Sequence, residues 1–319
     1  MALFQTKGEA MREFIEFNYS SSTGVNRIRA IKCYPDGNPK GIVQIAHGVA
    51  DHIDRYKEFM SFLSDNGFIA VGNDHLGHGH SVRHPIEQGF FAYYGGWQHV
   101  VNDMDKLRSI MVNEAPDIPY ILFGHSMGSF LTRTYIIEHP KDYHAAIISG
   151  TGHMKPAMIN SGYTLASSIA KAKGPRHASA LIDKIAFGSY NKAFEPARTK
   201  YDWISRDEEE VNKYAADPYC GFIATASLFK DMMGGLRFIT SSENIALMDK
   251  DKPVCFISGD MDPVGENGKG VERAYKAFCD AGIKDVYMKL YRGGRHEMLN
   301  EINKHEVYND ILRWINSKI

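Results

Sequence analysis

The chain has 319 residues, 44% of them hydrophobic, and a formal net charge of −1 at pH 7. Acidic and basic residues are interspersed, which excludes a strongly basic face, so we expect no nucleic-acid partner. This length and apolar content suit an enzyme of alternating strands and helices that forms one large core with an insertion.

The N-terminal segment, residues 1–14, carries charges and lacks a long apolar run, so we predict neither a signal peptide nor an anchor. No stretch of about 18 apolar residues occurs anywhere, and we expect no integral membrane segment. The four cysteines are Cys33, Cys220, Cys255 and Cys279. They form no C-x-x-C pair and no spacing typical of a disulfide framework, which indicates free thiols in a reducing compartment. We therefore expect a cytoplasmic protein.

Strand and helix patterns alternate through the first half of the chain. A hairpin around a Ser/Thr/Gly turn is predicted over residues 14–35. Short apolar runs typical of buried strands follow at residues 41–48, 68–74, 120–126 and 144–150. Helical spacing occurs over residues 56–63 and 97–115 and from the third of these strands to about His139, before Pro140. This alternation predicts a mostly parallel central sheet with helices on both faces.

The alternation breaks off after residue 150 and resumes near residue 252. The intervening residues show mostly helical patterns and no convincing buried strand. Strand patterns then return at residues 252–260 and 285–291, and helix patterns at residues 266–281 and from about Asn300 to Ile319. We therefore predict a core of residues 1–152 and 246–319, with a helical cap, or lid, of residues 153–245 inserted between core strands.

The segment GHSMG, residues 124–128, fits the pattern G-x-S-x-G. An apolar strand precedes it and a helix follows, which is the strand–turn–helix setting of a nucleophile elbow. Such a turn holds Ser126 in a strained backbone conformation with its hydroxyl projecting above the sheet. The amide of Met127 then lies at a helix N-terminus, where an N–H group can meet developing negative charge.

A serine hydroxyl needs a general base, and the base needs an orienting carboxylate. In a nucleophile-elbow enzyme the order along the chain is serine, acid, histidine. Among the histidines after Ser126, only His296 lies in a loop directly after a late strand, so it is the predicted base. The acid should follow the strand VCFISG, where Asp260 and Asp262 qualify equally by position.

These segments together resemble the α/β-hydrolase superfamily, and within it the monoacylglycerol lipase and lysophospholipase branch, grouped with serine aminopeptidase-like sequences. The resemblance covers most of the chain. It rests, in family order, on HGVADHIDRY (47–56), DHLGHGHS (74–81), GHSMG (124–128), SGDMDPVG (258–265) and RHEMLNE (295–301).

The resemblance implies which residues serve as the acid and as the oxyanion donors, roles that spacing alone does not assign. The family's acid lies three residues after the glycine, which selects Asp262 over Asp260. The residue after His-Gly gives the second oxyanion amide, here Val49, beside that of Met127. His47 and His52 are implied to set the loop rather than to react.

The histidines of DHLGHGHS raise the question of a metal site. A helical zinc site needs histidines four residues apart with a carboxylate between them, and Gly77 and Gly79 interrupt any helix here. The resemblance implies a packed loop, which Asp74, His78 and Ser81 hold by local hydrogen bonds. We therefore predict no metal and no cofactor.

The resemblance implies a serine-dependent carboxylic ester hydrolase that cleaves single-chain acyl esters, monoacylglycerol or lysophospholipid, through an acyl-enzyme. The expected partner is the small-molecule acyl ester, and nothing indicates an oligomeric state. An aminopeptidase or thioesterase using the same triad stays open, with Glu195, Asp202 and Asp207 as candidate groups for a substrate amine. A catalytically inactive binding protein of the same fold is the other alternative.

The predicted cap is rich in apolar side chains at helical spacing. We expect most of them to pack the cap onto the core: Ala157, Met158, Leu165, Ile169, Leu181, Ile182, Ile185 and Phe187. A lid over a serine site would also form the upper wall of an acyl pocket. It could touch a membrane surface transiently, although no strongly basic amphipathic helix supports such contact.

Overall fold

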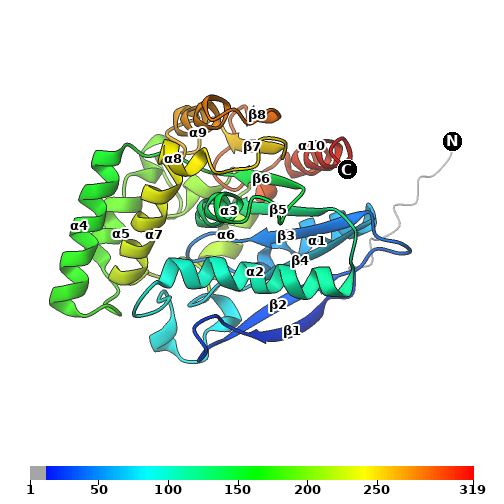
Figure 1. The fold of residues 1–319 in the computed structure, drawn as a ribbon. Coiled ribbons are helices and arrows are strands. Elements are labelled where there is room, and N and C mark those ends of the chain that lie inside the picture. Colours follow the sequence, from blue (N-terminus) through cyan, green and yellow to red (C-terminus); the bar gives the residue numbers. More distant parts are fainter. Residues whose placement is uncertain (1–11) are drawn as a thin grey trace.

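The computed structural model describes residues 12–319, so most of the segment expected to be neither signal peptide nor anchor lies outside the described residues. The described strands form one sheet in the order β1-β2-β4-β3-β5-β6-β7-β8 (Figure 1). Their bounds are β1 Ile15–Ser20, β2 Arg27–Cys33, β3 Gly41–Ala46, β4 Phe68–Asn73, β5 Tyr120–His125, β6 Ala145–Ser149, β7 Val254–Gly259 and β8 Val286–Tyr291.

The first strands pair antiparallel, β1 with β2 and β2 with β4, and the remaining neighbours pair parallel. Every residue of β3 to β7 is buried, because helices cover both faces of the sheet. This burial explains why these strands read as continuous apolar runs rather than as alternating ones. The predicted mostly parallel α/β sheet is confirmed.

Helices of the core pack on the two faces of this sheet (Figure 1). The helices α1 (Lys57–Asp65) and α10 (Lys304–Asn316) share one apolar cluster with one side of the strands. On the other side lie α2 (Gly96–Glu114), α3 (Met127–Glu138) and α9 (Lys269–Asp280). The last helix begins four residues later than about Asn300, since Met298–Asn300 form the short 3₁₀ helix η6.

Between β6 and β7 the described chain is helical, apart from one isolated bridge between Ala178 and Thr225. Its α-helices are α4 Pro156–Lys173, α5 Ala180–Phe187, α6 Glu208–Ala216, α7 Ala226–Ile239 and α8 Ser242–Ile245. We refer to residues 153–245 as the cap. Figure 1 shows α4, α5 and α7 gathered beyond one end of the sheet.

Short 3₁₀ helices complete the described structure: η1 Ile53–Tyr56, η2 Gly79–Ser81, η3 Pro85–Glu87, η4 Tyr190–Phe194 and η5 Asp202–Ile204, besides η6. The loops after β3, β5, β7 and β8 leave the same edge of the sheet, because these strands run parallel. Functional side chains of α/β sheets gather at this carboxyl edge. Among residues 12–319, no helix combines the length and apolar character needed to cross a membrane.

The expectation that most apolar cap residues pack onto the core is wrong for half of the set. Met158, Leu181 and Ile185 are 55%, 56% and 61% exposed, and Ala157 is exposed as well. The reason is geometric: α4 packs on α7 at the outside of the cap, and α5 buries only Ile182. The cap therefore presents apolar side chains to its surroundings.

Candidate active site

Ser126 stands at the turn between β5 and α3 in a strained conformation. Its φ of 54° and ψ of −122° are rare for a residue with a side chain. The flanking glycines explain how the turn is made, because a Cβ on Gly124 would overlap the Gly128 carbonyl, and one on Gly128 would overlap the Ala46 carbonyl. Glycine at both positions therefore allows the start of α3 to pack closely against the ends of β3 and β5.

Asp262 and His296 form a buried pair at the ends of β7 and β8. The Nδ1–H group of His296 donates to both carboxylate oxygens of Asp262 at 3.0 Å. The carboxylate also accepts from the Ser258 hydroxyl at 3.2 Å and from the Val264 amide at 2.9 Å. These bonds fix the tautomer of the imidazole and leave its Nε2 as the acceptor nitrogen.

Asp260, the other candidate acid, lies elsewhere. Its Oδ1 accepts from the Gly293 amide at 2.6 Å, which ties the loop after β7 to the loop after β8. The structure therefore pairs the histidine with Asp262 and uses Asp260 to shape the loop.

The His296 ring lies beside the elbow. Its centroid is 4.6 Å from that of His125, the residue before Ser126, and a Cβ on Gly150 would touch both rings. The hydrogen bonds of residues 12–319 do not include one between the Ser126 hydroxyl and His296. In enzymes without bound substrate this bond is often long, and it tightens on binding.

The loop that follows β8, residues 292–301, is bonded to the cap through its main chain. The His296 amide donates to the Trp203 carbonyl at 3.4 Å, and the Glu297 amide donates to the Ile204 carbonyl at 2.7 Å. The Trp203 ring also lies 5.0 Å from the imidazole. Cap residues thus help to position the histidine.

The loop that follows β3, residues 47–52, lies directly against the serine. A Cβ on Gly48 would be 3.2 Å from the Ser126 Cβ. The Nδ1–H of His47 donates to the Gly48 carbonyl at 2.7 Å, which fixes the peptide unit that also carries the Val49 N–H. Neither the Val49 nor the Met127 amide has an acceptor among the hydrogen bonds of the described residues.

The DHLGHGHS segment, residues 74–81, is hydrogen-bonded to the 47–52 loop and to the residue that follows it. The His75 amide donates to His47 Nε2 at 2.9 Å, so the proton of His47 resides on Nδ1. Asp74 accepts from the amides of Ile53 and His80 at 2.9 Å each, and the Ser81 hydroxyl donates to the Asp74 carbonyl. The histidine-rich segment therefore scaffolds the 47–52 loop.

We expect the folded protein to lose stability in mild acid. Burial lowers the pKa of His78 to about 4, and burial also lowers the pKa values of His47 and His75. In the unfolded chain these imidazoles titrate near about 6.5. The unfolded state therefore binds more protons below that pH, and stability falls as the pH drops from about 6.5 toward 4, by about 3 kcal/mol for His78 alone. Denaturant unfolding at several pH values measures this loss.

Some carboxyls oppose the trend, since the folded chain takes up protons there: burial raises the pKa of Asp231 to about 6, and it also raises the pKa values of Asp74, Asp103 and Asp183. Burial lowers the pKa to about 4 in two further histidines, His125 and His153, so the buried histidines together outweigh these carboxyls. His78→Asn should show a shallower pH dependence than wild type. Equal unfolding free energies at about pH 7.5 and about pH 5 would contradict the prediction.

A buried network of charges that the sequence did not reveal joins the 47–52 loop to the 292–301 loop. Arg55 donates to Glu297 through two bonds of 2.8 and 2.6 Å and to Asp51 Oδ1 at 3.0 Å. Asp51 in turn accepts from the Gly48 amide at 3.3 Å and the Tyr56 hydroxyl at 2.9 Å. Burial alone would raise the pKa of Glu297, but the charge of Arg55 brings it below its usual range.

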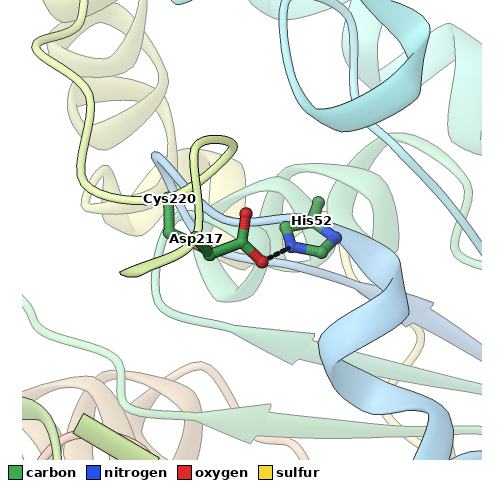
Figure 2. Close-up of side chains that lie close together, drawn as sticks. All are labelled: His52, Asp217 and Cys220. Carbon is green, nitrogen blue, oxygen red and sulfur yellow. Dashed lines mark hydrogen bonds and ion pairs between the residues drawn. The ribbon is translucent and has the colours of Figure 1, made fainter. Parts of the chain in front are cut away.

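His52, Asp217 and Cys220 place a nitrogen, an oxygen and a sulfur within 4.8 Å of one another (Figure 2). These are ligand types that zinc accepts. However, His52 Nε2 and Asp217 Oδ2 already share a hydrogen bond of 2.9 Å. Burial raises the pKa of the Cys220 thiol well above its usual range, which keeps it protonated. We interpret the group as a contact between core and cap.

A family model described as "Serine aminopeptidase, S33" matches residues 37–303. The chain belongs to this family. Its nucleophile-elbow fold and its family sequence confirm the predicted membership of the α/β-hydrolases. The match begins before β3 and ends after the 292–301 loop, and it therefore includes Ser126, Asp262, His296 and the 47–52 loop.

Two curated relatives of the chain that are named as lipases match most of its length. A monoacylglycerol lipase of Mycolicibacterium smegmatis is 29% identical over 304 residues, which cover 94% of this chain and 97% of the relative. The human monoglyceride lipase is 23% identical over 292 residues, covering 89% of this chain and 85% of the relative.

Solved structures agree on the fold. A thermostable carboxyl esterase from Bacillus coagulans, in complex with glycerol, has a TM-score of 0.89 at 28% identity, covering 96% of this chain and 98% of that one. The monoglyceride lipase of Saccharomyces cerevisiae has a TM-score of 0.75 at 22% identity, covering 100% of this chain and 99% of that one.

Proposed function

We propose that the protein is a serine hydrolase that cleaves single-chain acyl esters, with monoacylglycerol as the preferred substrate. The observation that carries the proposal is the strained Ser126 elbow beside the buried Asp262–His296 pair. The relatives named as monoacylglycerol and monoglyceride lipases, which match nearly the whole chain, support the substrate class.

The mechanism follows from the positions of these side chains. Ser126 Oγ attacks the ester carbonyl carbon while His296 Nε2 takes the hydroxyl proton. The protonated imidazole then gives that proton to the departing alcohol as the C–O bond breaks, which leaves an acyl-serine ester. Water attacks this ester by the same route and releases the fatty acid. Asp262, bonded to Nδ1, holds the imidazole and stabilises its positive charge.

The negative charge on the carbonyl oxygen needs donors that are already in place. The Val49 and Met127 amides, which have no acceptor within residues 12–319, are the donors that we assign to it. The bond from His47 to the Gly48 carbonyl supports this assignment, since it orients the peptide that carries the Val49 N–H. Loss of one such donor costs about 2.7–4 kcal/mol of barrier in other enzymes.

Two of the three acidic groups that an aminopeptidase could use for a substrate amine are engaged in local hydrogen bonds. Asp202 accepts from the Arg198 amide and the Thr199 hydroxyl, and Asp207 caps α6 by accepting from the amides of Glu209 and Glu210. Glu195 lies exposed on the cap. Asp202 and Asp207 serve the local fold, so an ester substrate is favoured over a peptide with a free amine.

A substrate panel tests the proposal. We expect kcat/KM for 1-monoacylglycerol to exceed those for lysophosphatidylcholine, acyl-CoA and a prolyl arylamide by more than about tenfold, a difference of about 1.4 kcal/mol in barrier. Wild-type protein should also be labelled by a fluorophosphonate probe. A preference for the arylamide would replace the proposal with a peptidase, and absence of labelling would favour an inactive protein.

We further propose that residues 153–245 act as a lid on a core of residues 1–152 and 246–319. The exposed apolar residues Met158, Leu181 and Ile185 support transient contact of this lid with a lipid surface, from which a single-chain ester is drawn. Binding to neutral phospholipid vesicles should weaken when these three residues are replaced by serine. Unchanged binding would remove this role.

We also propose a cytoplasmic location. All four cysteines are free thiols, and Cys33, Cys220 and Cys255 are buried, as expected where disulfides do not form. Fractionation of cells that express the tagged chain tests the location.

A further inference from the structure

The 47–52 loop is held by the cap as well as by the core. The carbonyl oxygen of Ala50 accepts from the Gly221 amide at 3.0 Å and from the Tyr214 hydroxyl at 3.0 Å. Ala50 adopts a φ of 50°, the left-handed region that a residue with a Cβ seldom occupies. The loop therefore depends on outside contacts to keep its shape.

A second bond joins the same loop to the same cap segment. His52 lies on the core side and meets Asp217 through the 2.9 Å bond drawn in Figure 2. The other oxygen of Asp217 accepts from the Tyr219 amide at 2.8 Å, so the carboxylate is oriented from within the cap. Residues 214–221 are therefore hydrogen-bonded to both Ala50 and His52, which lie on either side of Asp51.

Tyr214 is itself fixed from several sides. Its ring lies over the Arg55 guanidinium at 4.7 Å and beside the Tyr201 ring at 4.9 Å. The side chain is buried near the end of α6, and the Gly221 amide also reaches its hydroxyl at 3.2 Å. The hydroxyl therefore bridges the cap and the loop at a defined position.

We propose that Tyr214 is a positioning residue through which the seated cap sets the Val49 amide. The hydroxyl donates to the Ala50 carbonyl, and Ala50 directly follows Val49, whose N–H donates to the oxyanion. Seating of the cap then completes the oxyanion hole, and a displaced cap leaves it loose. This inference rests on the proposed ester hydrolysis, since it concerns the same oxyanion.

The substitution Tyr214→Phe tests the proposal, because it removes the hydroxyl and keeps the ring on Arg55. We expect kcat for a p-nitrophenyl ester to fall by about tenfold, less than loss of a whole oxyanion donor, since Gly221 still holds the carbonyl. KM should stay within about twofold, because the hole acts mainly in the transition state. Affinity for a trifluoromethyl ketone, whose adduct places an oxyanion in the hole, should fall by the same factor as kcat.

Tyr19→Phe is the matched control. The Tyr19 hydroxyl also donates to a main-chain carbonyl, that of Asp103, at 2.9 Å, and the two tyrosines are 8% and 7% exposed. This control removes an equivalent buried bond far from the site, so its melting temperature should fall comparably while its kcat stays at the wild-type value. Asp217→Ala, which breaks the second link, should lower kcat in the same direction as Tyr214→Phe.

The outcomes separate this inference from the proposed function. If Tyr214→Phe and Asp217→Ala both match the control in kcat and in ketone affinity, the positioning role is overturned while ester hydrolysis stands. If kcat falls and ketone affinity does not, the hydroxyl acts outside the oxyanion hole and the role is likewise overturned. Failure of wild-type protein to bind the ketone would remove the proposed function and this inference with it.

Discussion

Ser126→Ala is expected to lower kcat by about 10⁶-fold and to abolish labelling by a fluorophosphonate probe. The change removes the one oxygen that can form the acyl-enzyme, and alanine keeps the same strained backbone position, so the fold should be retained. Hydrolysis of a p-nitrophenyl ester with purified protein, together with the melting temperature, measures both effects.

Asp262→Asn provides a graded comparison for the serine variant. It keeps the size of the side chain but favours the wrong tautomer of His296, and it should cost about 10⁴-fold in kcat. Because the serine remains, slow labelling by the probe should persist. Full labelling of Ser126→Ala would show that another residue is the nucleophile.

Arg55→Met is expected to destabilise the protein by about 3–5 kcal/mol, the largest stability effect that we predict for a substitution. Arg55 is buried between Asp51 and Glu297, whose carboxylates are 4% and 7% exposed. Without the guanidinium the two negative charges face each other without compensation. Denaturant unfolding at neutral pH measures the change in free energy.

Two further variants identify the cause of that loss. Glu297→Gln in the Arg55→Met background should recover part of the stability, since it removes one uncompensated charge. Arg83→Met breaks an exposed pair with Glu87, at 3.4 Å, and should change stability by less than about 1 kcal/mol. An Arg55→Met protein as stable as Arg83→Met would contradict the role assigned to the buried network.

Sequence patterns predicted the sheet well because its strands are buried on both faces. Runs such as YILFGHS are buried on both faces, and a glycine lies at or within two residues of the end of each strand from β3 to β7. The mostly parallel α/β core and the helical interruption are confirmed for this reason. The cap was harder to predict, since an apolar stripe such as that of Ile182 and Ile185 does not tell which side of a short helix meets protein.

The candidate site divides in the same way. Motif and chain order identified Ser126 and His296, and the assignment of Asp262 and the oxyanion amides needed the family resemblance; the catalytic roles remain predictions. The link between Arg55 and Glu297 was missed because the two residues are 242 positions apart, and the segments that contain them, 47–56 and 295–301, do not by themselves show that their side chains meet. Only the docking of one loop on another brings them together.

The main-chain bonds from the 292–301 loop to Trp203 and Ile204 limit how the cap can be exchanged between related enzymes. A cap taken from a relative would have to present two carbonyls at the same places, or leave the amides of His296 and Glu297 unpaired beside the reacting atoms. Productive recombination should therefore transfer the cap together with that loop. Changes of substrate preference by cap shuffling alone should cost turnover, even where both parents are active.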